Sequence, residues 1–77
     1  MPVLPILSCW ETVKVFESLG WGVVRQKGSH IILIKPGSIA TLSVPNHKEV
    51  ARGTLRSLIR SAGMPVSEFL DARNRVA

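Results

Sequence analysis

Apolar residues recur along this chain with two different periods, and the change of period separates the expected helices from the expected strands. From Ser8 to Gly20 the spacing is that of one helix face. Ser8 and Glu11 fit a capping box, in which a serine hydroxyl and a glutamate carboxylate each accept a hydrogen bond from the other residue's backbone N–H. Gly20 is typical of the residue that follows a helix. The pattern therefore predicts a helix over about Cys9–Leu19.

Three short runs rich in apolar residues follow, each bounded by Gly, Ser or Pro. They cover Trp21–Gln26, His30–Lys35 and Ile39–Val44. The segments between them, Lys27-Gly-Ser29 and Pro36-Gly-Ser38, are typical of tight turns, so the runs predict an antiparallel meander. Every second residue of the third run is apolar, which gives the sheet one buried face and one largely polar face. The polar face is left for solvent or for a partner.

Helical spacing returns after the loop Pro45–Glu49. It predicts a second helix over about Thr54–Ala62, ended by a glycine and a proline, and a short third helix over about Ser67–Arg73. Both larger helices must bury their apolar stripes on the same face of the sheet. We therefore predict one α+β domain over residues 1–77, in which a three-stranded antiparallel sheet carries helices on one face and a short C-terminal helix is added.

Composition narrows the classes of protein to which the chain can belong. An apolar content of 45% and a positive mean hydropathy of +0.24 argue against disorder. No run approaches the roughly 20 apolar residues of a membrane span, and the apolar segment that ends at Leu7 lacks the features of an export signal. The single cysteine, Cys9, has neither a disulfide partner nor a basic neighbour to activate it. We expect a cytoplasmic protein with an inert thiol and with no metal or cofactor.

Positive charge is concentrated in the middle of the chain, whose formal net charge is +5. Between residues 25 and 60, Glu49 is the single acidic residue among seven basic ones, which suits a polyanionic partner. Three of the basic residues recur every fourth position and form a row on the second predicted helix, where they can follow successive phosphates. An ordinary solvated helix face has the same pattern. The row consists of Arg52, Arg56 and Arg60.

His30 is the first candidate for chemistry, because it opens the second predicted strand close to Arg25 and Lys27. A neutral imidazole accepts a proton near pH 7, and neighbouring cations stabilise charge that develops on a phosphate. A ribonuclease that works without a metal needs those groups. A lone histidine at a strand end also occurs for purely structural reasons, so the spacing alone leaves both interpretations open.

Other residues that are often functional have simpler interpretations here. His47 lies in a loop and is expected to be solvated. Trp10 and Trp21 could stack on bases, but packing in the core or capping of the core is favoured for both. The stretch Leu55–Leu70 has the form helix, turn, helix, which any two short consecutive helices produce.

Taken together, four blocks of this sequence resemble the HicA (YcfA-type) toxins of type II toxin–antitoxin systems. The resemblance implies a double-stranded-RNA-binding-like αβββα fold, cleavage of mRNA without a metal, and a HicB antitoxin that covers the active site. It implies that His30 is the catalytic histidine. Ile31 stands where many members carry a second histidine or a polar residue, so no mechanism with two adjacent imidazoles is expected. The blocks are Glu11–Leu19 with Gly20-Trp21, Arg25-Gln-Lys-Gly-Ser-His30, Val44-Pro-Asn-His47, and Gly53–Gly63.

On this interpretation the chain is an endoribonuclease, an mRNA interferase. His30 takes the proton from a ribose 2′-OH, which attacks the adjacent phosphorus and expels the 5′-oxygen, leaving a 2′,3′-cyclic phosphate. Lys27 or Arg25 stabilises the phosphorane, Ser29 positions the loop, and the arginine row binds RNA. Two alternatives stay open: an RNA-binding module without catalysis, and a DNA-binding helix-turn-helix protein.

Overall fold

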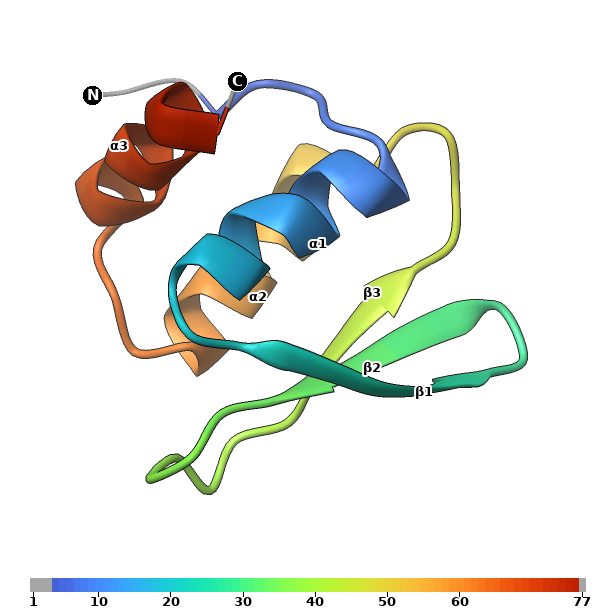
Figure 1. Ribbon diagram of the computed structural model, residues 1–77. Coiled ribbons are helices and arrows are strands. Elements are labelled where there is room, and N and C mark those ends of the chain that lie inside the picture. The colour runs from blue at the N-terminus through green and yellow to red at the C-terminus, as the bar shows by residue number, and fades with distance from the viewer. Residues whose placement is uncertain (1–3, 77) are drawn as a thin grey trace.

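One helix, three strands and two further helices follow one another in the computed structural model, which describes residues 4–76 (Figure 1). The strands form one antiparallel sheet in the order β1-β2-β3, and α1 and α2 pack on the same face of it. The predicted α+β class and αβββα order are confirmed. Residues 1–3, where the apolar N-terminal segment begins, and residue 77 lie outside the described part. The elements are α1 (Cys9–Ser18), β1 (Gly22–Lys27), β2 (His30–Ile34), β3 (Leu42–Pro45), α2 (Arg52–Ser61) and α3 (Val66–Val76).

The start of α1 has the capping box that its sequence predicts. The Ser8 hydroxyl accepts from the Glu11 N–H at 3.2 Å, and the Glu11 carboxylate accepts from the Ser8 N–H at 2.9 Å. The bond from the Ser8 backbone lowers the pKa of the Glu11 carboxyl. A carboxyl whose pKa is lowered by folding contributes stability near neutral pH, and that contribution is lost as the pH falls through the folded pKa.

Gly20 turns the chain from α1 into β1 with φ = +99°, a conformation that L side chains rarely adopt. A Cβ added here would also lie 3.3 Å from Cε of Lys35. We expect Gly20→Ala to lower the free energy of unfolding by about 1–2 kcal/mol. Urea denaturation measures this loss. Gly22→Ala is the control, because Gly22 has no positive φ and no atom within 4 Å of an added Cβ. Equal changes in the two variants would contradict the explanation.

The sheet divides its side chains between a covered and an open face. In β2, Ile31 and Leu33 are buried towards the helices, where they pair with Val44 and Leu42 of β3. Because side chains alternate along a strand, His30, Ile32 and Ile34 lie on the other face, which no helix covers within the described residues. We call this the open face.

The third strand begins three residues later than the sequence predicts, at Leu42 rather than Ile39. The turn after β2 continues through Ala40, whose N–H donates to the Ser38 hydroxyl at 3.2 Å. Ile39 is fully exposed and has no partner in the ladder. A local side-chain bond has replaced strand pairing at this point.

The C-terminal helix is longer than predicted, since α3 extends over Val66–Val76. Ser67 lies inside its first turn, and the carbonyl of Pro65 accepts from the N–H groups of Glu68 and Phe69. Phe69 is fully buried, with its ring 5.2 Å from that of Phe16 on α1. The helix therefore packs on α1 and α2 and not on the sheet. The second helix also differs from its expected range, beginning at residue 52 instead of 54.

Candidate nucleic-acid interface

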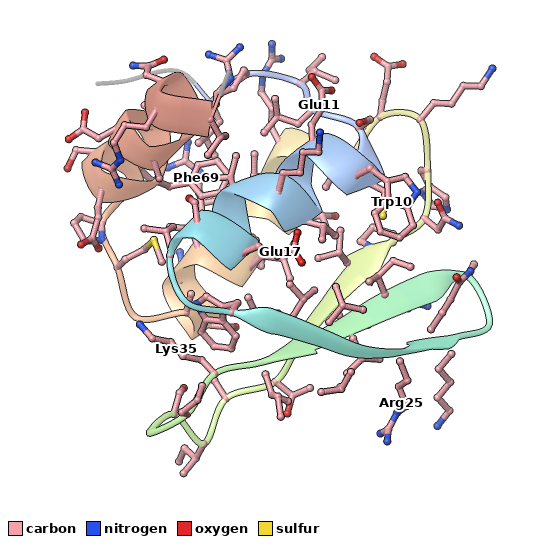
Figure 2. The ribbon with its side chains drawn as sticks, in the orientation of Figure 1. Trp10, Glu11, Glu17, Arg25, Lys35 and Phe69 are labelled. Carbon is pink, nitrogen blue, oxygen red and sulfur yellow. The ribbon has the colours of Figure 1, made fainter. Side chains whose placement is uncertain are left out.

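The open face brings together three of the residues singled out in the sequence. Lys27 pairs directly with His30 across the β1–β2 hairpin, and Arg25 pairs with Ile32. Paired residues of antiparallel strands point to the same side of a sheet, with Cβ atoms about 5 Å apart. All three polar side chains are exposed, and Arg25 projects away from the helices (Figure 2). One imidazole and two cations thus share one exposed surface.

The turn that carries His30 is fixed through its backbone. Gly28 adopts φ = +58° at the first position of the two-residue hairpin turn, a position that favours glycine. The carbonyl of Ser29 accepts from the N–H of Asn46 at 2.6 Å. This bond attaches the loop after β3 to the turn. Ser29 therefore contributes to positioning through its main chain.

The same loop reaches the start of α1. The carbonyl of His47 accepts from the N–H of Cys9 at 3.0 Å, which satisfies one of the N–H groups that the first helical turn leaves free. The His47 side chain is exposed, as expected for a loop residue. Two backbone hydrogen bonds thus gather the hairpin turn, the loop and the first turn of α1 at one end of the molecule.

The arginine row lies elsewhere. It stands on α2, which packs on the covered face of the sheet and so on the side away from His30. Arg52 is held by its own contact, since its Nε donates to the carbonyl of Leu4 at 2.8 Å. Arg56 and Arg60 are exposed along a shallow groove of about 230 Å³ between α2 and the start of α3. The structure therefore does not bring the row together with the open face.

The two tryptophans have different environments. Trp21 is buried, with its ring 6.5 Å from that of Phe16 in an edge-to-face contact, so packing is the correct interpretation for Trp21. For Trp10 it is wrong, because 54% of this residue is exposed. The exposure of Trp10 can be predicted from the sequence. When Cys9, Val13 and Phe16 face the core, the helical period places position 10 on the solvent side.

The thiol of Cys9 lies in the core and has no disulfide. Its burial raises the pKa, which keeps the thiol protonated and unreactive near neutral pH. Within residues 4–76, no three His, Cys, Asp or Glu side chains gather where they could hold a metal ion.

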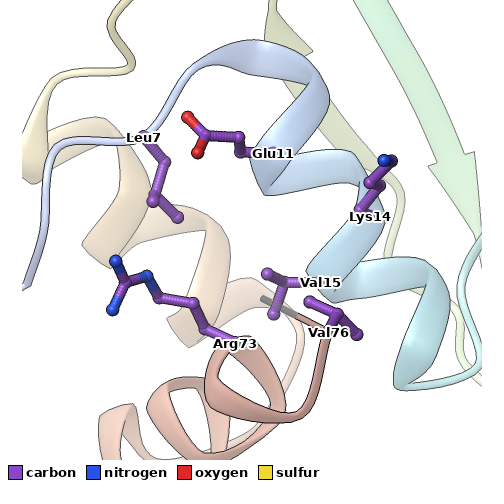
Figure 3. Close-up of a pocket in the computed structure, with 6 residues that line it drawn as sticks. All are labelled: Leu7, Glu11, Lys14, Val15, Arg73 and Val76. Atoms are coloured by element: carbon purple, nitrogen blue, oxygen red, sulfur yellow. The ribbon is translucent and has the colours of Figure 1, made fainter.

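A separate cleft of about 220 Å³ lies between α1 and the end of α3 (Figure 3). It contains none of the residues predicted for a site. The carboxylate of Glu11 and the guanidinium of Arg73 both line it, and the charge of Arg73 is a minor cause of the lowered pKa of Glu11. The remaining lining residues are Leu7, Lys14, Val15 and Val76.

None of the helices between residues 4 and 76 has the length and apolar character that crossing a membrane requires.

Comparison with known proteins identifies the family. Residues 10–64 match the model of the family described as the HicA toxin of bacterial toxin–antitoxin systems. The match begins in α1, ends just beyond α2 and includes the open face, whereas α3 lies outside it. A search of curated proteins gave no match. Because the matched range covers well over half of the chain, the protein belongs to the HicA toxin family, whose members are the toxins of toxin–antitoxin pairs.

Proposed function

We propose that this toxin is an endoribonuclease that cleaves mRNA without a metal, with His30 as its general acid and base. The observation that carries the proposal is the pairing of His30 with Lys27 beside Arg25 on the open face. An exposed imidazole beside two cations, on a face that no helix covers within residues 4–76, supports attack on an RNA phosphate. The surface can accept a single strand without rearrangement of the fold.

Each group has a defined role in the proposed reaction. The neutral imidazole of His30 removes the proton of a ribose 2′-OH while O2′ forms a bond to the adjacent phosphorus. The P–O5′ bond breaks, and the proton returns from the imidazolium to the leaving 5′-oxygen, so that the products are a 2′,3′-cyclic phosphate and a 5′-hydroxyl. Lys27 and Arg25 stabilise the negative charge that accumulates on the phosphorane oxygens. The ladders on both sides of β2 fix the backbone of His30.

The test is cleavage of a defined RNA by purified toxin in EDTA. We expect cleavage in the chelator, products with cyclic phosphate ends, and complete resistance wherever one 2′-OH is replaced by hydrogen. The deoxy substitution is the matched control, because it removes the attacking group and leaves charge and length unchanged. Loss of cleavage in EDTA with recovery in Mg²⁺ would contradict the mechanism. Binding without cleavage would favour the non-catalytic RNA-binding module.

Phosphate contacts are proposed for Arg25, Lys27 and Ser29 on the hairpin, and for the arginine row on α2. Each phosphate neutralised on a single strand contributes about −0.7 to the slope of log K against log salt, so about four contacts give a slope near −3. We expect Arg25→Ala and Arg56→Ala each to flatten the slope by about 0.7. Arg75→Ala on α3 is the control. An unchanged slope in Arg56→Ala would assign the row to the antitoxin or to solvent.

We further propose a cytoplasmic location and a HicB-type antitoxin that covers the open face. On that face Ile34 is exposed and apolar, Ile32 is nearly buried, and Arg25 and Lys27 lie on the neighbouring strand. Such a surface suits a partner with apolar and acidic side chains. The helix-turn-helix alternative is not favoured by α3, because the exposed side of that helix carries the carboxylates of Glu68 and Asp71, which DNA phosphates repel.

A further inference from the structure

Trp10 has no role in the proposed reaction, and its exposure is unusual. Tryptophan carries the largest apolar side chain, yet more than half of Trp10 meets solvent on the first turn of α1. The residue lies on the side of α1 that faces the hairpin and the loop leading to α2 (Figure 2). The exposed part of its side chain is open to a ligand.

Backbone hydrogen bonds connect the residue before Trp10 to the turn that carries His30. Trp10 follows Cys9, which bonds to the loop at His47, and the neighbouring Asn46 bonds to Ser29, which precedes His30. Summed over standard bond lengths, that path puts the Cα atoms of Trp10 and His30 at most about 25 Å apart. A few nucleotides of a single strand span such a distance.

The surroundings of Trp10 favour a nucleic acid over an apolar partner. The loop beside it carries the exposed residues His47, Lys48 and Glu49, Glu11 is exposed next to Trp10, and Lys27 stands at the adjacent hairpin turn. Lysines near an exposed aromatic ring are a combination that binds single strands, in which phosphates meet cations and a base stacks on the ring.

We propose that Trp10 is a base-stacking platform for the RNA strand, positioning it so that the scissile nucleotide lies over His30. This proposal rests on the proposed function. The strand crosses the hairpin turn, with its phosphates near Lys27 and one base on the indole of Trp10. Trp10 is a positioning residue and takes no part in the chemistry.

The experiment uses the full chain and a single-stranded oligonucleotide with 2′-O-methyl groups throughout, which cannot be cleaved by attack of O2′. Trp10→Ala is expected to weaken binding about tenfold, and Trp10→Phe to weaken it less. The salt slope should stay unchanged in both variants, because no charge is removed. Ile39→Ala, which removes a fully exposed apolar side chain in the turn after β2, should bind like the wild type.

Tryptophan fluorescence supplies an independent readout. Binding should quench the wild-type signal and leave Trp10→Phe unquenched, since the remaining Trp21 is buried. An abasic strand of equal charge should cause no quenching. The proposal would be overturned if Trp10→Ala bound the oligonucleotide with wild-type affinity, or if the abasic strand quenched the fluorescence equally. It would also be overturned if the substitution weakened binding of the antitoxin and left binding of the oligonucleotide unchanged. If the strand stacks on Trp10 but ordinary RNA is not cleaved, only the proposed reaction is refuted. If ordinary RNA is cleaved but Trp10→Ala binds RNA as tightly as the wild type, only the stacking platform is refuted.

Discussion

Replacing His30 with glutamine is expected to lower the rate of RNA cleavage by roughly 10²–10⁴-fold, because the amide cannot exchange a proton near neutral pH. RNA affinity should be preserved, since the cations of the hairpin and the backbone of β2 are unchanged. Single-turnover cleavage of a defined RNA, measured beside equilibrium binding, separates the two effects. In cells, the variant expressed without antitoxin should not arrest growth.

His47→Gln is the matched control for this variant. His47 is the second histidine of the chain, and its side chain is exposed on the loop beside the hairpin turn. If His30 is the general acid and base, the control should retain at least a large part of the wild-type rate. Equal losses in the two variants would point to a pair of imidazoles, and an unchanged rate in His30→Gln would refute the assigned role.

Truncation of Phe69 to alanine is expected to have the largest effect on folding, lowering the free energy of unfolding by about 3–5 kcal/mol. The side chain is fully buried and holds α3 against α1 through its contact with Phe16. The free energy of unfolding of a domain of this size is only about 5 kcal/mol, so this loss would remove most of its stability. Urea titration followed by far-ultraviolet circular dichroism measures the change.

Ile39→Ala is the control for this prediction too, since the side chain is fully exposed and its loss should change stability by no more than about 0.5 kcal/mol. A cost below about 1 kcal/mol for Phe69→Ala would show that α3 does not belong to the cooperative core. The result has particular weight because α3 lies outside the range that matches the family.

The elements predicted most closely are those whose signals are local. The capping box at Ser8 fixes the start of α1, and the Gly28-Ser29 turn fixes the register that pairs Lys27 with His30. The start of β3 and the length of α3 were less predictable. The first depends on a side-chain bond at Ser38, and the second on Phe69 finding its partner Phe16 far away in the sequence.

The candidate site also was predictable only where the signals in the sequence are local. Sequence spacing put Arg25, Lys27 and His30 near one another, and strand alternation gives them a common face. It could not show that the row on α2 lies on the other side of the sheet, because that depends on how helices pack on the strands. The exposure of Trp10 was not predicted because aromatic residues usually pack, although the helical period already placed it on the solvent side.

The two bonds that gather the His30 end of the molecule, from Asn46 to Ser29 and from Cys9 to His47, join main-chain atoms only. Any residue except proline supplies the N–H and the carbonyl that these bonds need. The side chains at positions 46–48 are therefore free to change without moving the histidine. Substitutions in this loop therefore change the surface beside the proposed reaction centre and leave the position of the His30 backbone constant.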